Sequence, residues 1–338
     1  MSVTLSVLDL SLITEGSSAA DALRNSRDLA RHTEQLGYYR YWVAEHHNMP
    51  GIASAATAVV IGHIAASTST IRVGAGGIML PNHAPLVIAE QFGTLETLNP
   101  GRIEVGLGRA PGTDQFTMRA LRRTLQTDEQ QFPRDVLELL SYFKPAEAGQ
   151  HVRAIPGVGL NVPVWILGSS LFGAQLAAML GLPYAFASHF APGALMHAAE
   201  MYRSRFEPSE YLAEPYMMAG FNVFAADTDE QALLIRTSSR QSTLNNRRGR
   251  PGQLPPPNGD FDAQLNHAER DMLDESQRCS AVGTADAVRE QIEQFVAQTG
   301  VDELMINANV YDQEARKRSY EIAMQCMADV VPPSRLSI

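Results

Sequence analysis

The sequence predicts an α/β protein whose single domain, residues 1–338, is a (β/α)8 TIM barrel with a proline-rich insertion late in the chain. Short runs of β-branched and aromatic residues alternate with helical patterns, and repeated strand–helix units imply parallel strands joined by right-handed crossovers. Eight runs have the character of strands. That number closes a barrel of this type, whereas an open doubly wound sheet usually has fewer strands.

The expected strands and helices follow one another in chain order. The strands cover residues 4–8, 39–44, 71–74, 103–107, 164–167, 184–187, 217–224 and 303–306. The helices cover 20–36, 54–67, 85–98, 128–143, 172–180, 192–206 and 228–245. One further helix begins at Gly283-Thr284, and the last one covers 313–327. The first helix places Leu23, Leu29 and Leu36 on one face at helical spacing. In such a barrel the chemistry lies where strands end and loops begin.

Residues 246–278 interrupt this alternation. Pro251, Pro255, Pro256 and Pro257 fall within the segment, where they oppose regular structure. The alternation returns afterwards, so we interpret the segment as an insertion or lid and not as a linker between domains.

Composition excludes several classes of protein. The formal net charge is −10, and 25 of the 27 basic residues are arginine, since only Lys144 and Lys317 are lysine. This balance opposes a general binder of nucleic acid or anionic membranes, although one cationic pocket could still hold a single phosphate. Cys279 and Cys326 suit a reducing cytosol and form no zinc motif. Neither a signal peptide nor a membrane-spanning run is visible, so we expect a cytoplasmic protein.

The second strand ends in Glu45-His46-His47-Asn48. Histidines beside a carboxylate suit an acid/base pair or metal ligands. Adjacent side chains in extended chain point to opposite sides, so the two histidines are not expected to serve one site. The alternative is that one histidine packs outward and hydrogen-bonds to a neighbour.

The third strand ends in a glycine run that includes Gly76 and Gly77. Glycine allows a backbone to approach a flat ligand closely, although a bulge with no ligand would need the same residues. The run lacks the GxGxxG spacing of a dinucleotide fold, and no phosphate-binding P-loop occurs in the sequence.

A phosphate site is expected at the ends of the fourth and fifth strands. Arg109 follows the fourth strand between small residues, and Ser169-Ser170 leads from the fifth strand into a helix. A guanidinium fork and the free amides of a helix start both bind anions. An ion pair at Arg109 and simple capping by serine are the alternatives for each alone. His189 and Met79 are further candidates for the pocket wall, or else core residues.

The block from WVAEHHNMPG to LNPGRIEVGLGRAPG resembles the bacterial luciferase-like, flavin-dependent monooxygenase family, closest to its small single-chain members. The later segments VPVWILGSS and VGTADAVREQIEQF are similar to it too, so the resemblance covers nearly the whole chain in order. EHH, the small-residue run before IMLP and the GRIEVGLGR block are specific in combination.

The resemblance implies roles for particular residues. His46 matches the catalytic histidine, and Gly76-Gly77 matches a bulge, often with a cis peptide bond, that supports the flavin ring. Arg109 matches a phosphate-binding arginine, and Ser170 with Ser169 matches the phosphate loop. Gly108 stands where light-emitting relatives have a reactive cysteine, so light emission is not implied.

The resemblance also implies an activity and partners. Reduced FMN and O2 would oxygenate a small organic substrate, with an aldehyde as one class, and His46 would act as the acid/base. No nicotinamide site is visible, so a separate reductase would supply the reduced FMN. Family members are commonly homodimers, and the alanine-rich helix at 54–67 is compatible with one. A deazaflavin-dependent hydride-transfer enzyme and a non-catalytic flavin-binding barrel are the alternatives.

Overall fold

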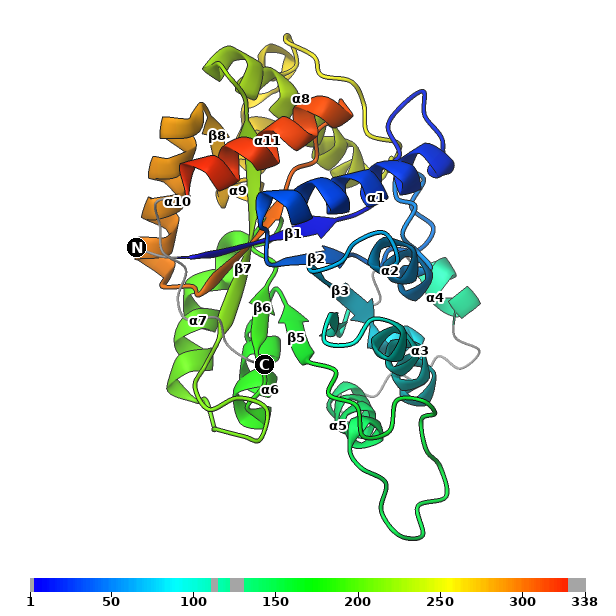
Figure 1. Cartoon of the computed structure of the whole chain (residues 1–338). Helices are drawn as coiled ribbons and strands as arrows, with labels where there is room; N and C mark the ends of the chain where they lie inside the picture. The colour runs from blue at the N-terminus through cyan, green and yellow to red at the C-terminus, as the bar shows by residue number, and fades with distance from the viewer. Residues whose placement is uncertain (1–2, 111–114, 122–130, 328–338) are drawn as a thin grey trace.

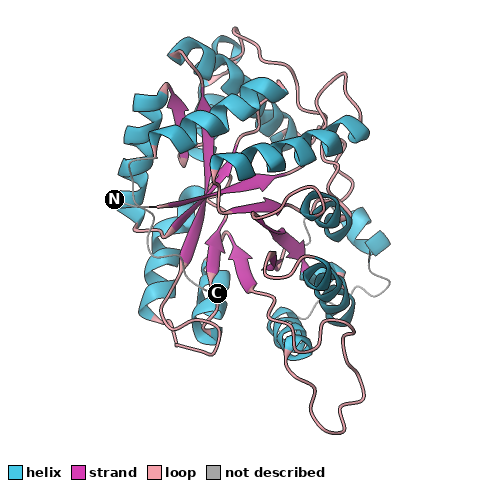
Figure 2. Ribbon diagram, viewed as in Figure 1, coloured by secondary structure: helices cyan, strands magenta, loops and turns pink. Residues whose placement is uncertain are grey.

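Eight parallel strands close into a barrel at the centre of the molecule, and helices surround it (Figures 1 and 2). The computed structural model describes residues 3–110, 115–121 and 131–327. The barrel strands are β1 (Thr4–Asp9), β2 (Arg40–Val43), β3 (Arg72–Met79), β4 (Ile103–Gly108), β5 (Val164–Gly168), β6 (Tyr184–Phe186), β7 (Met217–Ala225) and β9 (Glu303–Asn307). Neighbours in this order pair with one another, and β9 pairs with both β7 and β1 to complete the ring. The predicted (β/α)8 TIM barrel is thus confirmed.

One strand was not expected. Strand β8 (Ser280–Gly283) lies outside the ring and pairs in parallel with residues 222–225 of β7. Asn222 pairs with Asn307 of β9 on one side and with Ser280 of β8 on the other. Strand β8 therefore pairs with the same edge of β7 as β6, which pairs with residues 217–219 nearer the start of β7. A run as short as Ser-Ala-Val-Gly carries almost no periodic signal, which explains why the sequence did not reveal it.

The described helices largely follow the predicted ranges. They are α1 (Ala19–Leu36), α2 (Thr57–Ala65), α3 (Pro85–Leu98), α4 (Gln115–Leu121), α5 (Gln131–Phe143), α6 (Leu171–Leu180), α7 (Leu195–Ser204), α8 (Asp229–Arg247), α9 (His267–Ser276), α10 (Ala285–Thr299) and α11 (Gln313–Cys326), with short 3-10 turns at 80–82, 192–194 and 262–264. The helix expected to begin at residue 128 starts at Gln131 among the described residues, and residues 122–130 lie outside them. Helices α4 and α9 were not predicted.

Capping residues set the limits of the first helix. Ser18 and Asp21 form a reciprocal capping box at its start, and Gly37, with φ of 89°, ends it in the left-handed conformation. Leu29 and Ala30 are buried on its inner face. The helix therefore packs on the barrel with the face that the leucine spacing predicted.

A buried ion cluster fills the amino-terminal end of the barrel. The guanidinium of Arg40 is paired with Glu303, at 2.8 Å, and with Glu104, and all three side chains are buried. Tyr216 donates a hydrogen bond to Glu303 at 2.8 Å. Because this end is occupied by paired groups and packed rings, an open site can lie only toward the carboxyl ends of the strands.

The proline-rich segment after α8 crosses the barrel mouth, and Figure 1 shows it in yellow near the loop that follows β1. Leu254 donates a backbone hydrogen bond to Ile13 at 2.9 Å and accepts one from Glu15 at 2.9 Å. A Cβ added at Gly51 would lie 2.3 Å from the carbonyl oxygen of Gly252, so the backbones meet closely there. The segment is fastened to the loops after β1 and β2.

Of the helices that the structure describes, none has both the length and the apolar character that crossing a membrane requires.

Candidate active site at the carboxyl ends of the strands

A cavity of about 720 Å³ opens at the carboxyl ends of the barrel strands. It brings together every site residue that the sequence predicted. These residues are His46, Gly76, Gly77, Met79, Arg109, Ser169, Ser170 and His189. They come from the ends of five consecutive strands, β2 to β6, so barrel closure alone explains their convergence.

The two adjacent histidines after β2 face different surroundings. His46 lines the cavity, whereas Nε2 of His47 lies 2.8 Å from Oε1 of Glu45, away from the cavity lining. This is the alternation that an extended chain imposes. One histidine therefore lines the cavity and the other is bonded to a neighbour, so the two side chains have the opposite orientations that the sequence analysis expected.

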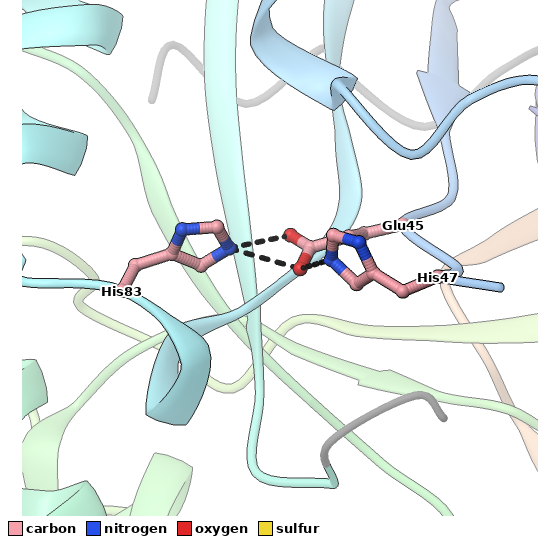
Figure 3. Close-up of side chains that lie close together, drawn as sticks. All are labelled: Glu45, His47 and His83. Atoms are coloured by element: carbon pink, nitrogen blue, oxygen red, sulfur yellow. Dashed lines mark hydrogen bonds and ion pairs between the residues drawn. The ribbon is translucent and has the colours of Figure 1, made fainter. Parts of the chain in front are cut away.

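Glu45 bonds to His47 on its own loop and to His83 on the segment after β3, as Figure 3 shows. Its buried carboxylate contacts Nε2 of His47 and Nε2 of His83, the latter at 2.9 Å, and accepts the backbone N–H of Met79 at 3.1 Å. Burial alone would raise the pKa of Glu45, but these hydrogen bonds and the nearby charge of His83 together hold the pKa below its usual value. The carboxylate thus stays charged and its oxygens stay bonded.

The same three side chains have the composition of a metal-ligand set. In the part of the chain that the structure describes, Glu45, His47 and His83 form the one such group, with ligand atoms within 4.8 Å of one another. Their histidine nitrogens bond directly to the carboxylate. We therefore interpret the group as a hydrogen-bonded support for the ends of β2 and β3.

The glycine run forms the expected bulge in β3. The register against β4 shifts between Gly76 and Ile78, and the peptide bond between Gly76 and Gly77 is cis. A Cβ on Gly77 would lie 2.6 Å from the carbonyl oxygen of Gly106, and one on Gly76 would lie 2.9 Å from Leu8. Glycine is needed at both positions because neighbouring strands leave no room for a side chain.

Arg109 and the start of α6 form a cationic corner of the cavity. Among the described residues Arg109 forms no ion pair, and its guanidinium carbon lies 4.1 Å from the centre of the Phe172 ring. Ser170 is the N-cap of α6, but its side chain makes no capping hydrogen bond. Among the described residues, therefore, the structure shows neither an acidic partner for Arg109 nor side-chain capping by Ser170.

Three asparagines on the cavity wall were missed by the sequence analysis. Asn222 donates a hydrogen bond from Nδ2 to the backbone oxygen of His189 at 2.6 Å, and Asn307 donates to Oδ1 of Asn222 at 3.3 Å. Oδ1 of Asn307, Oδ1 of Asn309 and Nδ1 of His189 are buried with no partner among the described residues. Asn307 is the last residue of β9 and Asn309 lies two residues beyond it, so the rule applied to the other strand ends would have found them.

Burial controls the protonation of His189. Desolvation, together with the smaller effect of the charge of nearby His46, lowers the pKa of His189 to about 4. His189 is therefore neutral near pH 7.

The remaining floor of the cavity is apolar, with side chains from several barrel strands. These are Leu8, Trp42, Leu167, Met218 and Met305.

Comparison with known proteins agrees with this geometry. The luciferase-like monooxygenase family model matches residues 3–303. The chain is 52% identical over 329 residues, 97% of its length and 98% of the relative's, to the luciferase-like monooxygenase of Escherichia coli K12. It is 38% identical over 237 residues, 68% of its length and 70% of the relative's, to the N-acetyl-S-alkylcysteine monooxygenase of Bacillus subtilis.

Solved structures show the same fold. The crystal structure of apo-MsnO8 is similar with a TM-score of 0.87 and 34% identity, covering 98% of this chain and all of that one. The FMN complex of the oxygenating constituent of 3,6-diketocamphane monooxygenase from Pseudomonas putida has a TM-score of 0.72 at 17% identity, with 99% and 100% of the two chains covered. The chain belongs to the luciferase-like monooxygenase family of flavin-dependent oxidoreductases.

Proposed function

We propose that the chain is an FMN-dependent monooxygenase that uses reduced FMN and O2 to oxygenate a small organic substrate. One observation carries the proposal. A single cavity contains an arginine with no acidic partner in the described part of the chain, a helix start whose serine makes no capping hydrogen bond, a glycine bulge and a histidine. These are the groups that a phosphate, a flat ring and a proton transfer require.

The donor set fits FMN at both of its ends. Arg109 would hold the phosphate together with the hydroxyls of Ser169 and Ser170 and the free amides at the start of α6. The unpartnered oxygens of Asn307 and Asn309 suit the N–H groups at the polar edge of the ring. Reduced FMN, when bound, supplies the electrons with which O2 is activated.

The protein's own side chains would manage protons and water. His46 lines the cavity, and its neighbours Glu45 and His47 are bonded to each other, so its ring would face a substrate in the cavity. An imidazole can accept and return a proton near pH 7, which suits the acid/base step of oxygenation. The segment at 246–278 would act as the lid, because Gly252 and Leu254 line the cavity and Leu254 is 2% exposed.

Titration with two reduced cofactors tests the proposal. Reduced FMN is expected to bind and to support O2-dependent product formation across a panel that includes aldehydes and thioethers. Thioethers belong in the panel because the Bacillus subtilis relative is named for an S-alkylcysteine substrate. Tight binding of reduced deazaflavin alone would indicate hydride transfer instead, and binding of FMN without turnover on any substrate would indicate a storage barrel.

We further propose a cytoplasmic homodimer that receives reduced FMN from a separate reductase. Val59 on α2 is 73% exposed, and Val87 and Leu98 on the neighbouring α3 are 43% and 71% exposed, so these two helices present exposed apolar side chains that a second copy could cover. Cys279 and Cys326 are both buried and unpaired, which supports a reducing compartment.

A further inference from the structure

The cavity carries a positive charge pattern in an acidic protein. Arg109 and Arg247 line it, and no aspartate or glutamate is among the described lining residues. The chain as a whole has a formal net charge of −10. Two cations without a carboxylate beside them create a local positive potential that favours anionic ligands. One phosphate on FMN accounts for Arg109 and leaves Arg247 without a function.

Arg247 differs from the other arginines around it. Arg240 is paired with Asp262 at 2.9 Å and with Asp274 at 2.7 Å, and Arg248 is paired with Glu269. Arg236 donates to Gln277 at 3.0 Å. Arg247 alone among these four lines the cavity, and within the described part of the chain it has no ion pair or side-chain hydrogen bond.

The wall that leads to Arg247 is polar. Four polar residues of α8 line the cavity: Ser239, Ser242, Thr243 and Asn246. Except for the adjacent Ser242 and Thr243, they are spaced three or four residues apart, so they lie on one face of the helix, and Arg247 is at the end of that face. Helix α8 packs on β7 and β8, whereas Arg109 follows β4. The two arginines therefore reach the cavity from different sides of the barrel.

We propose that Arg247 binds an anionic group of the substrate, a carboxylate, while the apolar body of the substrate lies against the cavity floor formed by Leu8, Trp42, Leu167, Met218 and Met305. A guanidinium fork matches the two oxygens of a carboxylate, and apolar contacts with the floor supply affinity without direction. This proposal depends on the proposed function in one respect, which is that the bound anion is called a substrate. Arg247 would determine specificity for acids over neutral compounds.

Equilibrium binding without flavin or O2 tests this site directly. The chain has two tryptophans, of which Trp42 lines the cavity and lies in edge contact with Trp165, so quenching of their fluorescence reports occupancy. The probes are linear carboxylic acids from hexanoate to dodecanoate, each compared with its methyl ester. The variants are Arg247→Gln and Arg247→Lys. Arg250→Gln is the matched control, because Arg250 is exposed as Arg247 is and lies three residues away, but does not line the cavity.

The acid is expected to bind the native protein about tenfold or more tightly than its ester, as a charge-assisted hydrogen bond would produce. Arg247→Gln should remove that preference, Arg247→Lys should restore part of it, and Arg250→Gln should leave it unchanged. The proposal is overturned if no acid in the series binds better than its ester, including the case in which neither binds, or if the preference survives in Arg247→Gln. It is also overturned if Arg247→Gln weakens FMN binding as strongly as it weakens acid binding, because Arg247 would then hold the cofactor phosphate. Failure of FMN to bind the native protein would contradict the proposed function and leave the acid preference standing.

Discussion

The buried carboxylate of Glu45 accepts the backbone N–H of Met79 at 3.1 Å, which joins the end of β2 to the end of the β3 bulge. His46 directly follows Glu45, and the cis peptide bond between Gly76 and Gly77 lies just before Met79 in the chain. One carboxylate therefore fixes the histidine proposed for proton transfer relative to the backbone proposed to support the flavin ring. Glu45 does not line the cavity, so we assign it as a positioning residue.

Replacing Glu45 by glutamine should reduce both stability and activity. The amide is uncharged and has one acceptor oxygen for three donors, so the free energy of unfolding should fall by about 1–3 kcal/mol. The value of kcat should fall more than KM rises, because the position of His46 and not substrate contact is disturbed. Urea unfolding and steady-state kinetics measure the two effects.

Glu34→Gln is the matched control for that prediction. The carboxylate of Glu34 also accepts backbone N–H groups, those of Ser69, Thr70 and Ile71, but it lies at the amino-terminal end of β3, far from the cavity lining. It should lose stability with no change in kcat. Equal loss of kcat in both variants would show that Glu45 has no positioning role.

His46→Ala should strongly reduce the rate of FMN-dependent oxygenation while leaving FMN binding nearly unchanged. Removal of a general acid/base typically lowers the rate by about 100-fold to 10,000-fold. The surface residue His197 supplies the control His197→Ala, because it is exposed on α7. Oxygenation by His46→Ala at the native rate would exclude the proposed role.

Arg109→Gln should weaken FMN binding by about tenfold to 100-fold, because a charge-assisted hydrogen bond to the phosphate is lost. Riboflavin has the same ring and no phosphate, so its affinity should be the same for the native protein and the variant. Flavin fluorescence titrations compare the two ligands. A parallel loss of riboflavin affinity would mean that Arg109 supports the ring or the fold and not the phosphate.

Glutamate at Val59 or Leu98 should shift the proposed dimer toward monomer. A charge placed in an apolar interface must lose its hydration, so the dissociation constant should rise at least about tenfold. Leu233→Glu is the control, since Leu233 is 54% exposed on α8, a different helix. Sedimentation velocity over a range of concentrations distinguishes the outcomes, and an unchanged dimer in both α2 and α3 variants would place the interface elsewhere.

The sequence allowed the strand ends to be identified because barrel topology brings them together whatever the loops contain. His46, Arg109 and Ser170 were found in this way. The contact of Glu45 with Met79 and the pairing of the α8 arginines could not be predicted, since they join segments whose separation in space depends on side-chain packing. Arg247 could be identified as a candidate binding residue only from the structure, which shows the neighbouring Arg240 and Arg248 in ion pairs. Strand β8 was missed because four residues give no period.

The pKa of His189 predicts a specific loss of stability in mild acid. Burial lowers the pKa of His189 to about 4, against about 6.5 in the unfolded chain. Above pH 6.5 both states are neutral, and the residue contributes no pH dependence. As the pH falls from 6.5 toward 4, the unfolded chain takes up a proton that the folded protein does not, so the free energy of unfolding decreases.

The loss between pH 7 and pH 5 should amount to about 2 kcal/mol for this one group. His189→Gln removes the titrating group and should have a flatter profile over that range. The buried carboxylates Asp9 and Glu45 have lowered pKa values, so their contribution is lost at lower pH and is common to both proteins. Urea unfolding of the two proteins at several pH values gives the difference directly. Parallel profiles would show that His189 is hydrated enough to be protonated in the folded state.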